Sequence, residues 1–305
     1  MNSDNIQDTL FKKYYSDNKF SEVTSSHWID FGKKTKVIRD NDSFNISAYG
    51  ISNFHNKESL LGTLKHFPVD YLLSQMLKEY HARDETIQAA ESITSHLNIY
   101  FDFDHAKHVL IYDLLDSYGL FNTEDLICII GDGHGFFGTL IKKLNPKIKI
   151  LFINLGRNLL IDCICFSKAF PELKPLLLEE APKSDGFPKN DEIVFLEAEY
   201  YERMKTLPIS LFINVASMQE MDISVVNQYF EYIRTSTAKP HFYSINREEK
   251  TLPNGNITRF ADYPWGESEV LLDGICPFYQ KYPNWHPPFW KQFDGTHRHR
   301  LIKIN

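Results

Sequence analysis

Short apolar runs in the second half of the chain have the length and spacing of buried strands. Leu126–Ile130 is the clearest run, and it leads through a glycine-rich segment into a helical pattern at 139–144. Uninterrupted apolar runs between turn residues are typical of strands buried on both faces of a parallel sheet. Further strands are expected at 148–153, 193–196, 209–213, 241–247 and 301–304. The pattern predicts an α/β sheet domain over residues 121–305.

The first 120 residues have a helical periodicity instead. Apolar residues recur every three or four positions over Pro68–Tyr80, and similar patterns follow at 87–96 and 105–118. Gly119 is placed to end the last of these helices. We therefore expect a mainly helical N-terminal region over 1–120 that leads directly into the sheet domain. Such helices either shape a ligand pocket or oligomer contact, or only cover the sheet.

Glycines stand at positions 131, 133, 135 and 138, directly after the first strand. Glycine lets the chain turn tightly and lets a ligand lie against the backbone, and the next helix presents its N–H groups to that ligand. The spacing fits the dinucleotide fingerprint and equally the first motif of S-adenosylmethionine-dependent methyltransferases. The loop thus predicts a nucleotide-binding corner, with two cofactors open, whose candidate residues are Gly131, Asp132, Gly133, His134 and Gly135.

The ends of the next strands supply further candidates, because open α/β sheets bind ligands at their carboxyl edge. Dinucleotide enzymes usually carry an acid after the second strand, but here Asn154 stands in that place. An amide holds a ribose hydroxyl more weakly than a carboxylate does, which counts modestly against both cofactors. The cofactor-binding candidates at these strand ends are Asn154, Leu155, Leu196, Glu197, Asn214 and Ser217.

Several segments together resemble a known family, the sugar O-methyltransferases of bacterial surface-polysaccharide gene clusters. The resemblance covers roughly residues 120–305 and rests on the glycine loop, Asn214–Met221, Ile245–Arg247, Asp262–Trp265 and the His/Arg-rich stretch 297–300. It implies the Rossmann-like sheet of class I methyltransferases, with seven mostly parallel strands and an antiparallel edge supplied by the C-terminal strand. It also implies S-adenosylmethionine as the cofactor.

The function that the resemblance implies is methyl transfer from S-adenosylmethionine to a sugar hydroxyl in capsule or other surface-polysaccharide biosynthesis. The acceptor is a nucleotide-activated sugar or a glycan. The open alternatives are an NAD(P)-dependent oxidoreductase acting on a sugar and a metal-dependent glycosyltransferase. Cofactor binding would discriminate between these classes.

A sugar hydroxyl is a poor nucleophile, so a general base is expected. Glu220, just after the fourth strand, is the first candidate, and His134 and His286 are the others. Glu220 is equally suited to bind a substrate hydroxyl, to cap a helix or to ligate a divalent cation, although no carboxylate triad indicates a metal.

The acceptor side is expected to include residues that follow the fourth and fifth strands. Segment 248–296 is long and rich in Pro, Gly and aromatic residues, so we interpret it as an insertion over the acceptor. The forked donors of Arg247 suit a phosphate or carboxylate, with an ion pair to a nearby acid as the alternative. The substrate-binding candidates are Gln219, Asn246, Arg247, Tyr263 and Trp265.

Two other motifs have both a chemical and a structural interpretation. Asp102 and Asp104 have the Asp-x-Asp spacing with which glycosyltransferases hold a metal, but Asp104 is better placed to cap a helix that begins at His105. His297 and His299 alternate with arginines and could bind metal or phosphate. An exposed face of an edge strand is the favoured explanation for these two histidines.

Composition limits the classes of partner. A net charge of -7 argues against nonspecific nucleic-acid binding, and no apolar run reaches the ~20 residues of a membrane span. The start of the chain has no signal-peptide pattern, so a cytoplasmic protein is expected. The four cysteines follow no disulfide or zinc pattern and are expected as core thiols. A homo-oligomer is compatible with the sequence.

Overall fold

An eight-stranded sheet forms the centre of the computed structural model, which describes residues 6–16, 36–40, 43–47, 60–122, 125–178, 193–236, 238–284 and 287–304. Its strand order is β11 (Glu269–Ile275), β14 (His297–Lys303), β8 (His241–Arg247), β7 (Ile209–Val215), β3 (Leu126–Ile130), β4 (Lys149–Asn154), β6 (Ile193–Glu197) and β5 (Leu176–Leu177). Strands β8 to β5 pair in parallel, and β14 runs antiparallel between β8 and β11. The predicted Rossmann-like class I methyltransferase sheet is thereby confirmed.

The details of the sheet differ from the expectation at both ends. The C-terminal strand β14 lies inside the sheet, and β11, from the segment interpreted as an insertion, forms the edge. The short strand β5 extends the other side beyond the seven expected strands. Strand β11 was not predicted, because it has no continuous apolar run. It is half exposed, and Val270 and Ile275 are each more than half open to solvent.

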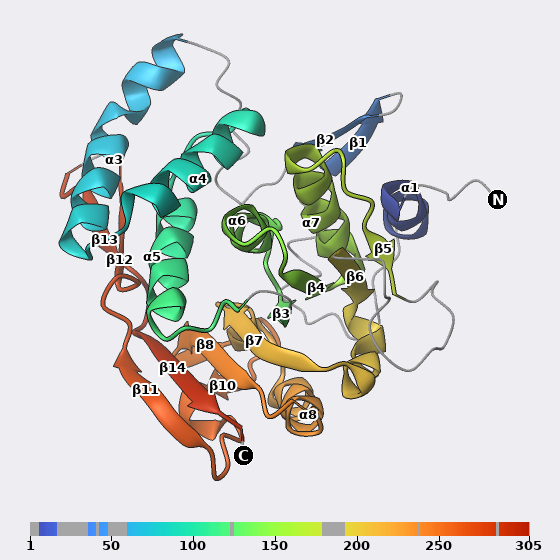
Figure 1. The fold of residues 1–305 in the computed structure, drawn as a ribbon. Coiled ribbons are helices and arrows are strands. Elements are labelled where there is room, and N and C mark those ends of the chain that lie inside the picture. Colours follow the sequence, from blue (N-terminus) through green and yellow to red (C-terminus); the bar gives the residue numbers. More distant parts are fainter. Residues whose placement is uncertain are drawn as a thin grey trace.

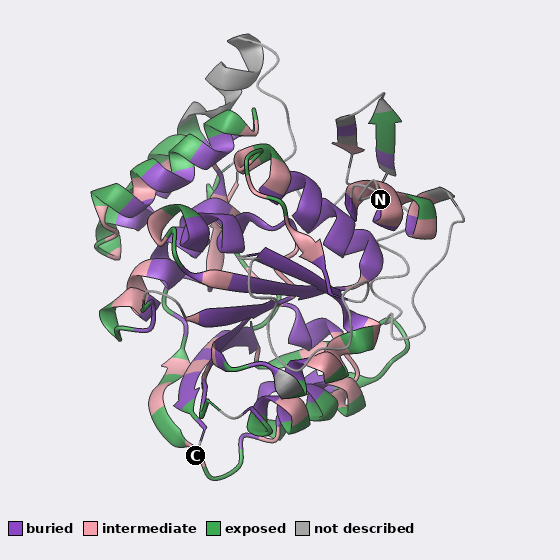
Figure 2. Ribbon diagram, turned by 45° about the vertical axis from the view of Figure 1, so that its right-hand side comes forward, coloured by how far each residue is buried: buried purple, intermediate pink, exposed green. Residues whose placement is uncertain are grey.

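Apolar side chains on both faces of the strands build two cores. On β3, Ile127 and Ile129 enter one core, while Cys128 and Ile130 enter the other. Helices α6 (Phe136–Leu144) and α7 (Gly156–Ala169) cover the first face, and α8 (Ile223–Arg234) with the 3-10 helix η2 (Ala198–Thr206) covers the second (Figure 1). Figure 2 shows the central strands buried throughout, as expected for a parallel sheet between helices.

Most of the described residues of the N-terminal region are helical, as expected. Helices α3 (Leu60–Glu79), α4 (Asp84–His96) and α5 (Phe103–Ser117) lie on one side of the molecule (Figure 1). Helix α3 begins before the predicted start and carries Pro68 inside it. The region also contains α1 (Ile6–Phe11), the π-helix η1 (Lys12–Ser16) and a hairpin of β1 (Lys36–Asp40) and β2 (Ser43–Ser47).

Helix α5 begins two residues earlier than predicted, and its N-cap is Asp102 rather than Asp104. The Asp102 carboxylate accepts the backbone N–H groups of Asp104 and His105 at 2.8 and 3.2 Å. The backbone N–H of Asp102 donates to His105 Nδ1 at 3.1 Å, which completes a capping box. The assignment to Asp104 was wrong because His105 serves as the third helical residue of the box, not as the first.

The remaining elements lie near the carboxyl edge of the sheet. They are the 3-10 helices η3 (Met218–Glu220) and η4 (Phe260–Asp262), and two hairpins formed by β9 (Glu249–Thr251) with β10 (Ile257–Arg259) and by β12 (Lys281–Pro283) with β13 (Trp290–Gln292). All four cysteines are buried and free, as predicted. Across the described ranges, no helix is long and apolar enough to cross a membrane.

His297 and His299 are not on an exposed edge face. They are only 1% and 6% exposed, because β11 covers the outer side of β14 and aromatic side chains cover its face. The ring of His297 stacks on Tyr279 at 4.2 Å, and that of His299 meets Tyr243 edge to face. The expectation of an exposed edge strand was therefore wrong for both histidines.

Candidate active site

Three glycines of the loop after β3 adopt the left-handed conformation that side chains disfavour. The φ angles of Gly131, Gly133 and Gly135 are +73°, +88° and +70°. A Cβ at Gly131 would collide with Ser217, and one at Gly135 would lie 2.7 Å from the Asp162 carbonyl oxygen. A Cβ at Gly133 would meet nothing within 4 Å. The loop is thus packed tightly at both ends and open at its middle glycine, where a ligand can approach the backbone.

Two carboxyl groups hold this loop in place, one within it and one on α7. Asp132 accepts the backbone N–H groups of Phe137 and Gly138 at 3.1 and 2.8 Å, so it holds the start of α6. Burial raises the pKa of Asp132 to about 6, although these hydrogen bonds oppose the shift. Asp162 of α7 is fully buried beside Gly135, and burial together with Asp132 keeps the pKa of Asp162 well above its ordinary range. Asp132 therefore has a positioning role in the described structure.

Asn154 ends β4 in the place where an acid was absent from the sequence. Its amide donates to the Asp162 carboxylate at 2.8 Å, and its oxygen accepts the N–H of Leu155 at 2.9 Å. Asp162 therefore fixes both the glycine loop and the residue that ends the second strand of the corner. A lone carboxyl between apolar residues of α7 is the sequence signal for it.

Glu197, at the end of β6, is bound by a lysine from the start of the chain. Lys13 Nζ lies 2.9 Å from each carboxylate oxygen of Glu197, and the neighbouring Tyr14 ring packs on Gly156. Burial raises the pKa of Glu197 to about 7, while Lys13 acts to lower it. The segment 12–16 thus completes the corner, a contribution that the sequence analysis missed.

A network of buried amides and hydroxyls ties the ends of β3, β7 and β8 together. Asn214 and Ser217 both donate to the carbonyl oxygen of Ile130, at 2.9 and 3.0 Å. Asn246 donates to Asn214 Oδ1 at 2.9 Å and accepts the N–H of Gln219 at 2.9 Å. Since Asn214 and Asn246 are fully buried, they support the site from beneath instead of presenting their side chains to a ligand.

Glu220 projects from η3 beside polar neighbours. Its Oε1 lies 3.3 Å from Gln219 Nε2 and 3.5 Å from Lys250 Nζ, and the side chain is almost buried. Lys250 comes from β9, so the 248–296 segment does reach the carboxyl edge next to Glu220. A carboxylate with a cation and an amide beside it is able to accept a proton from a bound hydroxyl.

His134, in the middle of the glycine loop, meets two histidines of α5. Its ring lies 5.7 Å from that of His105 and 6.4 Å from that of His108. Burial lowers the pKa of His134 to about 4, so its imidazole is neutral at pH 7. No set of three His, Cys, Asp or Glu side chains within the described part of the chain is arranged to hold a metal ion.

A second group of polar side chains connects α5 with β8 and β14. Lys107 Nζ donates to Asp104 at 2.7 Å and lies 3.2 Å from the Tyr279 hydroxyl. Burial alone would lower the pKa of Lys107, but Asp104 and Tyr279 raise it overall. Tyr279 stacks on His297, which is paired with Arg247 across the two strands. Apart from the i,i+3 spacing of Asp104 and Lys107, no local sequence pattern links these residues.

Three of the expected site residues, Leu196, Tyr263 and Trp265, lie in the core on the α8 side. Trp265 packs against Phe230 and Phe242 in the core on the α8 side, with its indole N–H bonded to the Phe260 carbonyl oxygen at 2.9 Å, and Leu196 is also buried there. Tyr263 lies in the same core, where its ring contacts those of Phe260 and Trp265. His286 lies outside the described residues.

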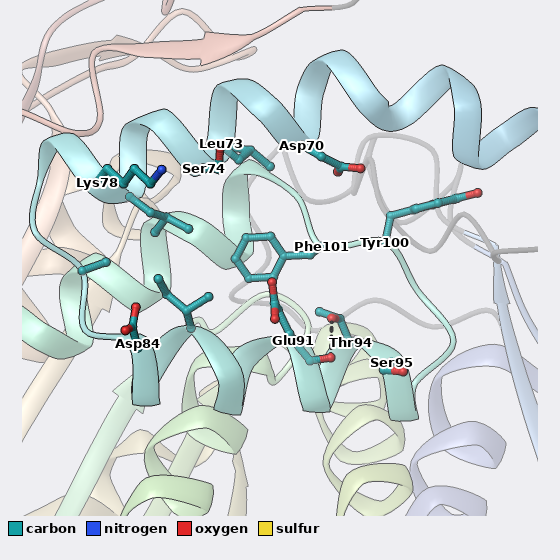
Figure 3. A pocket seen from close by; sticks show the side chains of 13 residues that line it. Asp70, Leu73, Ser74, Lys78, Asp84, Glu91, Thr94, Ser95, Tyr100 and Phe101 are labelled. Atoms are coloured by element: carbon teal, nitrogen blue, oxygen red, sulfur yellow. Dashed lines mark hydrogen bonds between the residues drawn. The ribbon is translucent and has the colours of Figure 1, made fainter.

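A pocket of about 710 Å³ opens between α3 and α4 (Figure 3), within the usual volume range of small-molecule sites. Leu73 and Phe101 contribute apolar surface, while Asp70, Asp84, Glu91 and Lys78 contribute charge. The ring of Phe101 lies 5.9 Å from that of His105, which in turn reaches His134. The N-terminal helices therefore do form a pocket, and one histidine separates it from the glycine loop.

Comparison with known proteins gives only distant similarities. No protein-family model and no curated protein matches the chain. Among solved structures, a protein of Thermoplasma acidophilum is 7% identical, with 72% of this chain and 97% of the other covered at a TM-score of 0.43. A SAM-dependent methyltransferase of Aquifex aeolicus is 11% identical over 64% of this chain and 89% of its own, at a TM-score of 0.36.

A geranyl diphosphate methyltransferase in complex with SAM is 10% identical, with 65% of this chain and 85% of the other covered at a TM-score of 0.42. Identities and TM-scores this low do not transfer an activity or a ligand from these proteins to the chain.

Proposed function

We propose that the protein transfers a methyl group from S-adenosylmethionine to a sugar hydroxyl. The observation that carries the proposal is the left-handed glycine loop, open at Gly133, at the carboxyl edge of a sheet that contains an antiparallel strand next to β8. The dinucleotide-binding fold has a parallel sheet without that inserted strand, which disfavours the oxidoreductase alternative.

The residues around the loop fit the proposed cofactor. The backbone of 131–135 can approach it closely, and the N-terminus of α6 lies behind the loop. Asn154 and Glu197 end the next two strands, where their hydrogen bonds to Asp162 and Lys13 shape the corner that would receive ribose and adenine, and Leu155 adds apolar surface. Asn214 and Ser217 hold the loop in place through the Ile130 carbonyl oxygen.

When bound, the cofactor supplies an electrophilic methyl group, so a covalent intermediate with the protein is unnecessary. The task of the protein is to hold the acceptor oxygen in line and to remove its proton. Glu220 is the proposed base, because it lies at the carboxyl edge beside Gln219 and Lys250. His134 is the second candidate, since its imidazole is neutral and lies in the loop itself.

The sugar acceptor and the role in capsule or other surface-polysaccharide biosynthesis are supported by the resemblance of Asn214–Met221 and Asp262–Trp265 to that family. Of the expected substrate-binding residues, we retain Gln219 and Arg247 as proposed contacts of the acceptor. The Gln219 side chain accepts the backbone N–H of Arg247 at 2.7 Å and lies directly beside Glu220.

The test is calorimetric binding of S-adenosylhomocysteine to the parent and two glycine variants. Gly133→Val should abolish binding by filling the open space above the loop. Gly255→Val is the matched control, because Gly255 has a φ of +87° and equally open surroundings in the β9–β10 turn. The control should bind like the parent, which shows that a strained valine in another turn of the protein does not by itself abolish binding.

NADH is titrated under the same conditions. Tight NADH binding without S-adenosylhomocysteine binding would overturn the proposal and favour the oxidoreductase alternative. Binding of neither ligand by a folded parent protein would also overturn it.

A further inference from the structure

We propose that the acceptor carries an anionic group, a phosphate or a carboxylate, which Arg247 binds while His297 binds a neighbouring hydroxyl. That the bound molecule is the methyl acceptor rests on the proposed function. The anion site itself rests on the arrangement of β8, β14 and α5. The two residues are directly opposite each other in the antiparallel pair of β8 and β14. Directly opposed side chains in such a pair lie on the same face, ~5 Å apart at Cβ.

Arg247 is held in place by its backbone while its side chain keeps donor capacity. Its backbone N–H donates to Gln219 Oε1 at 2.7 Å. Among the described residues, its guanidinium has an ion pair only with Asp294, at 3.9 Å, and the Asp294 side chain is fully exposed. The buried Nε of Arg247 has no hydrogen-bond partner. A loose pair with an exposed carboxylate contributes little, so an incoming anion can displace it.

His297 provides a second unfilled position beside this arginine. The side chain is 1% exposed, and its Nδ1 has no hydrogen-bond partner in the described structure. Stacking on Tyr279 at 4.2 Å fixes the plane of the ring. A buried polar atom without a partner is costly, and a hydroxyl of a bound ligand would satisfy it.

The charges around His297 favour an anion over a cation. Burial, Arg247, Lys107 and Lys250 all act to lower the pKa of His297, which falls to about 3. Lys107 is paired with Asp104, and Lys250 lies 3.5 Å from Glu220, so Arg247 has the loosest carboxylate partner of the three cations. The pocket between α3 and α4 does not suit the anionic group, because Asp70, Asp84 and Glu91 line it with Lys78.

The chemistry thus points to a ligand in which an anionic group and a hydroxyl are close neighbours, as in a sugar phosphate or a uronic acid. Guanidinium binds either group through two parallel hydrogen bonds. The experiment measures calorimetric binding of glucose 6-phosphate, glucuronate and methyl glucoside, each with and without saturating S-adenosylhomocysteine. At least one anionic probe should bind ~10-fold or more tightly than methyl glucoside, since a charged hydrogen bond contributes on that scale. The preferred probe distinguishes phosphate from carboxylate.

Three variants assign the site. Arg247→Ala should weaken the preferred probe ~10-fold or more, and Arg247→Lys should recover part of the loss because it keeps the charge but not the fork. His297→Phe keeps the stacking on Tyr279 and should weaken the same probe by removing Nδ1. Arg259→Ala is the control, because Arg259 is an exposed arginine paired with Glu249 on the neighbouring hairpin.

Equal affinity for methyl glucoside and both anionic probes would overturn the inference. So would equal effects of Arg247→Ala and Arg259→Ala, or failure of all three probes to bind at ~10 mM, a concentration well above a Kd of ~1 mM. If S-adenosylhomocysteine binds but no anionic probe binds through Arg247, the proposed function stands without the anion site. If it does not bind but an anionic probe binds through Arg247, the anion site stands and the proposed function fails.

Discussion

Lys13 Nζ lies 2.9 Å from both carboxylate oxygens of Glu197, although the two residues are 184 positions apart in the chain. The pair attaches η1 to the end of β6, at the corner that also contains the glycine loop. Because Glu197 is buried and Lys13 is half-buried, the protonation of the carboxyl group affects the stability of the whole corner.

The pair makes stability depend on pH in a defined direction. The pKa of Glu197 is raised by burial to about 7, so the folded protein holds its proton more tightly than the unfolded chain does. The stabilisation is therefore present at low pH and is lost as pH rises from about 4.5 through 7. Lys13→Met removes the cation that opposes this pKa shift. The loss of stability with rising pH should therefore continue to higher pH in the variant than in the parent.

The measurement is the Tm of the parent and Lys13→Met at pH 5 and pH 8. The Tm of the variant should lie further below that of the parent at pH 8 than at pH 5. At pH 8 the Glu197 of the variant has to ionise without a cation beside it or keep a proton that the solvent would otherwise take. Lys12→Met, an exposed neighbour, should follow the parent at both values. A deficit that is equal at both pH values would contradict this explanation.

Glu220→Gln tests the proposed base. The variant keeps the size of the side chain and removes its ability to accept a proton, so kcat should fall ~10²–10⁴-fold. Affinity for S-adenosylhomocysteine should remain close to that of the parent. Glu249→Gln is the matched control, because Glu249 lies on β9 beside Lys250 but is exposed.

A kcat of Glu220→Gln within a few-fold of the parent would reject the base and direct attention to His134. Loss of parental activity in a chelator, with recovery in Mg²⁺ or Mn²⁺, would instead identify Glu220 as a metal ligand.

His134 makes the stability of the folded protein fall at acid pH. Burial lowers the pKa of His134 to about 4, so the unfolded chain takes up a proton that the folded protein excludes. Stability is complete above the ordinary histidine pKa of 6.5 and is lost as pH falls toward 4, by at most roughly 3 kcal/mol for this residue. His134→Gln should reduce that loss, as measured by urea unfolding between pH 8 and pH 4. His81→Gln, at an exposed position, should leave the profile unchanged.

The parallel part of the sheet could be predicted because its strands are buried on both faces. In β3 every residue is apolar and every residue is buried, so the pattern and the environment agree. Strand β14 contains His297, Arg298, His299 and Arg300, and a polar run of this kind does not reveal that it lies inside a sheet. Its burial depends on β11 and Tyr279, which the local sequence does not specify.

The site was predictable where one residue type is required by backbone geometry. Gly131, Gly133 and Gly135 adopt positive φ angles, and their spacing identified the loop. Lys13 and the contact of Lys107 with Tyr279 were not predicted, because Glu197 and Tyr279 come from distant segments. Trp265 was placed on the acceptor side because an aromatic residue has the same appearance in sequence whether it stacks on a sugar or fills a core.

The position of β14 between β8 and β11 also constrains the order in which the sheet can assemble. The ribosome makes β11 before β14, yet β11 has no place in the sheet until residues 297–303 are available to pair with it. Strands β3, β4, β6 and β7 have no such delay, so the glycine-loop corner can form while β8 still exposes its edge. Long-range pairings of this kind are slow to form, and an open strand edge favours association between chains. The glycine loop can therefore form before the strands that carry Arg247 and His297 are paired.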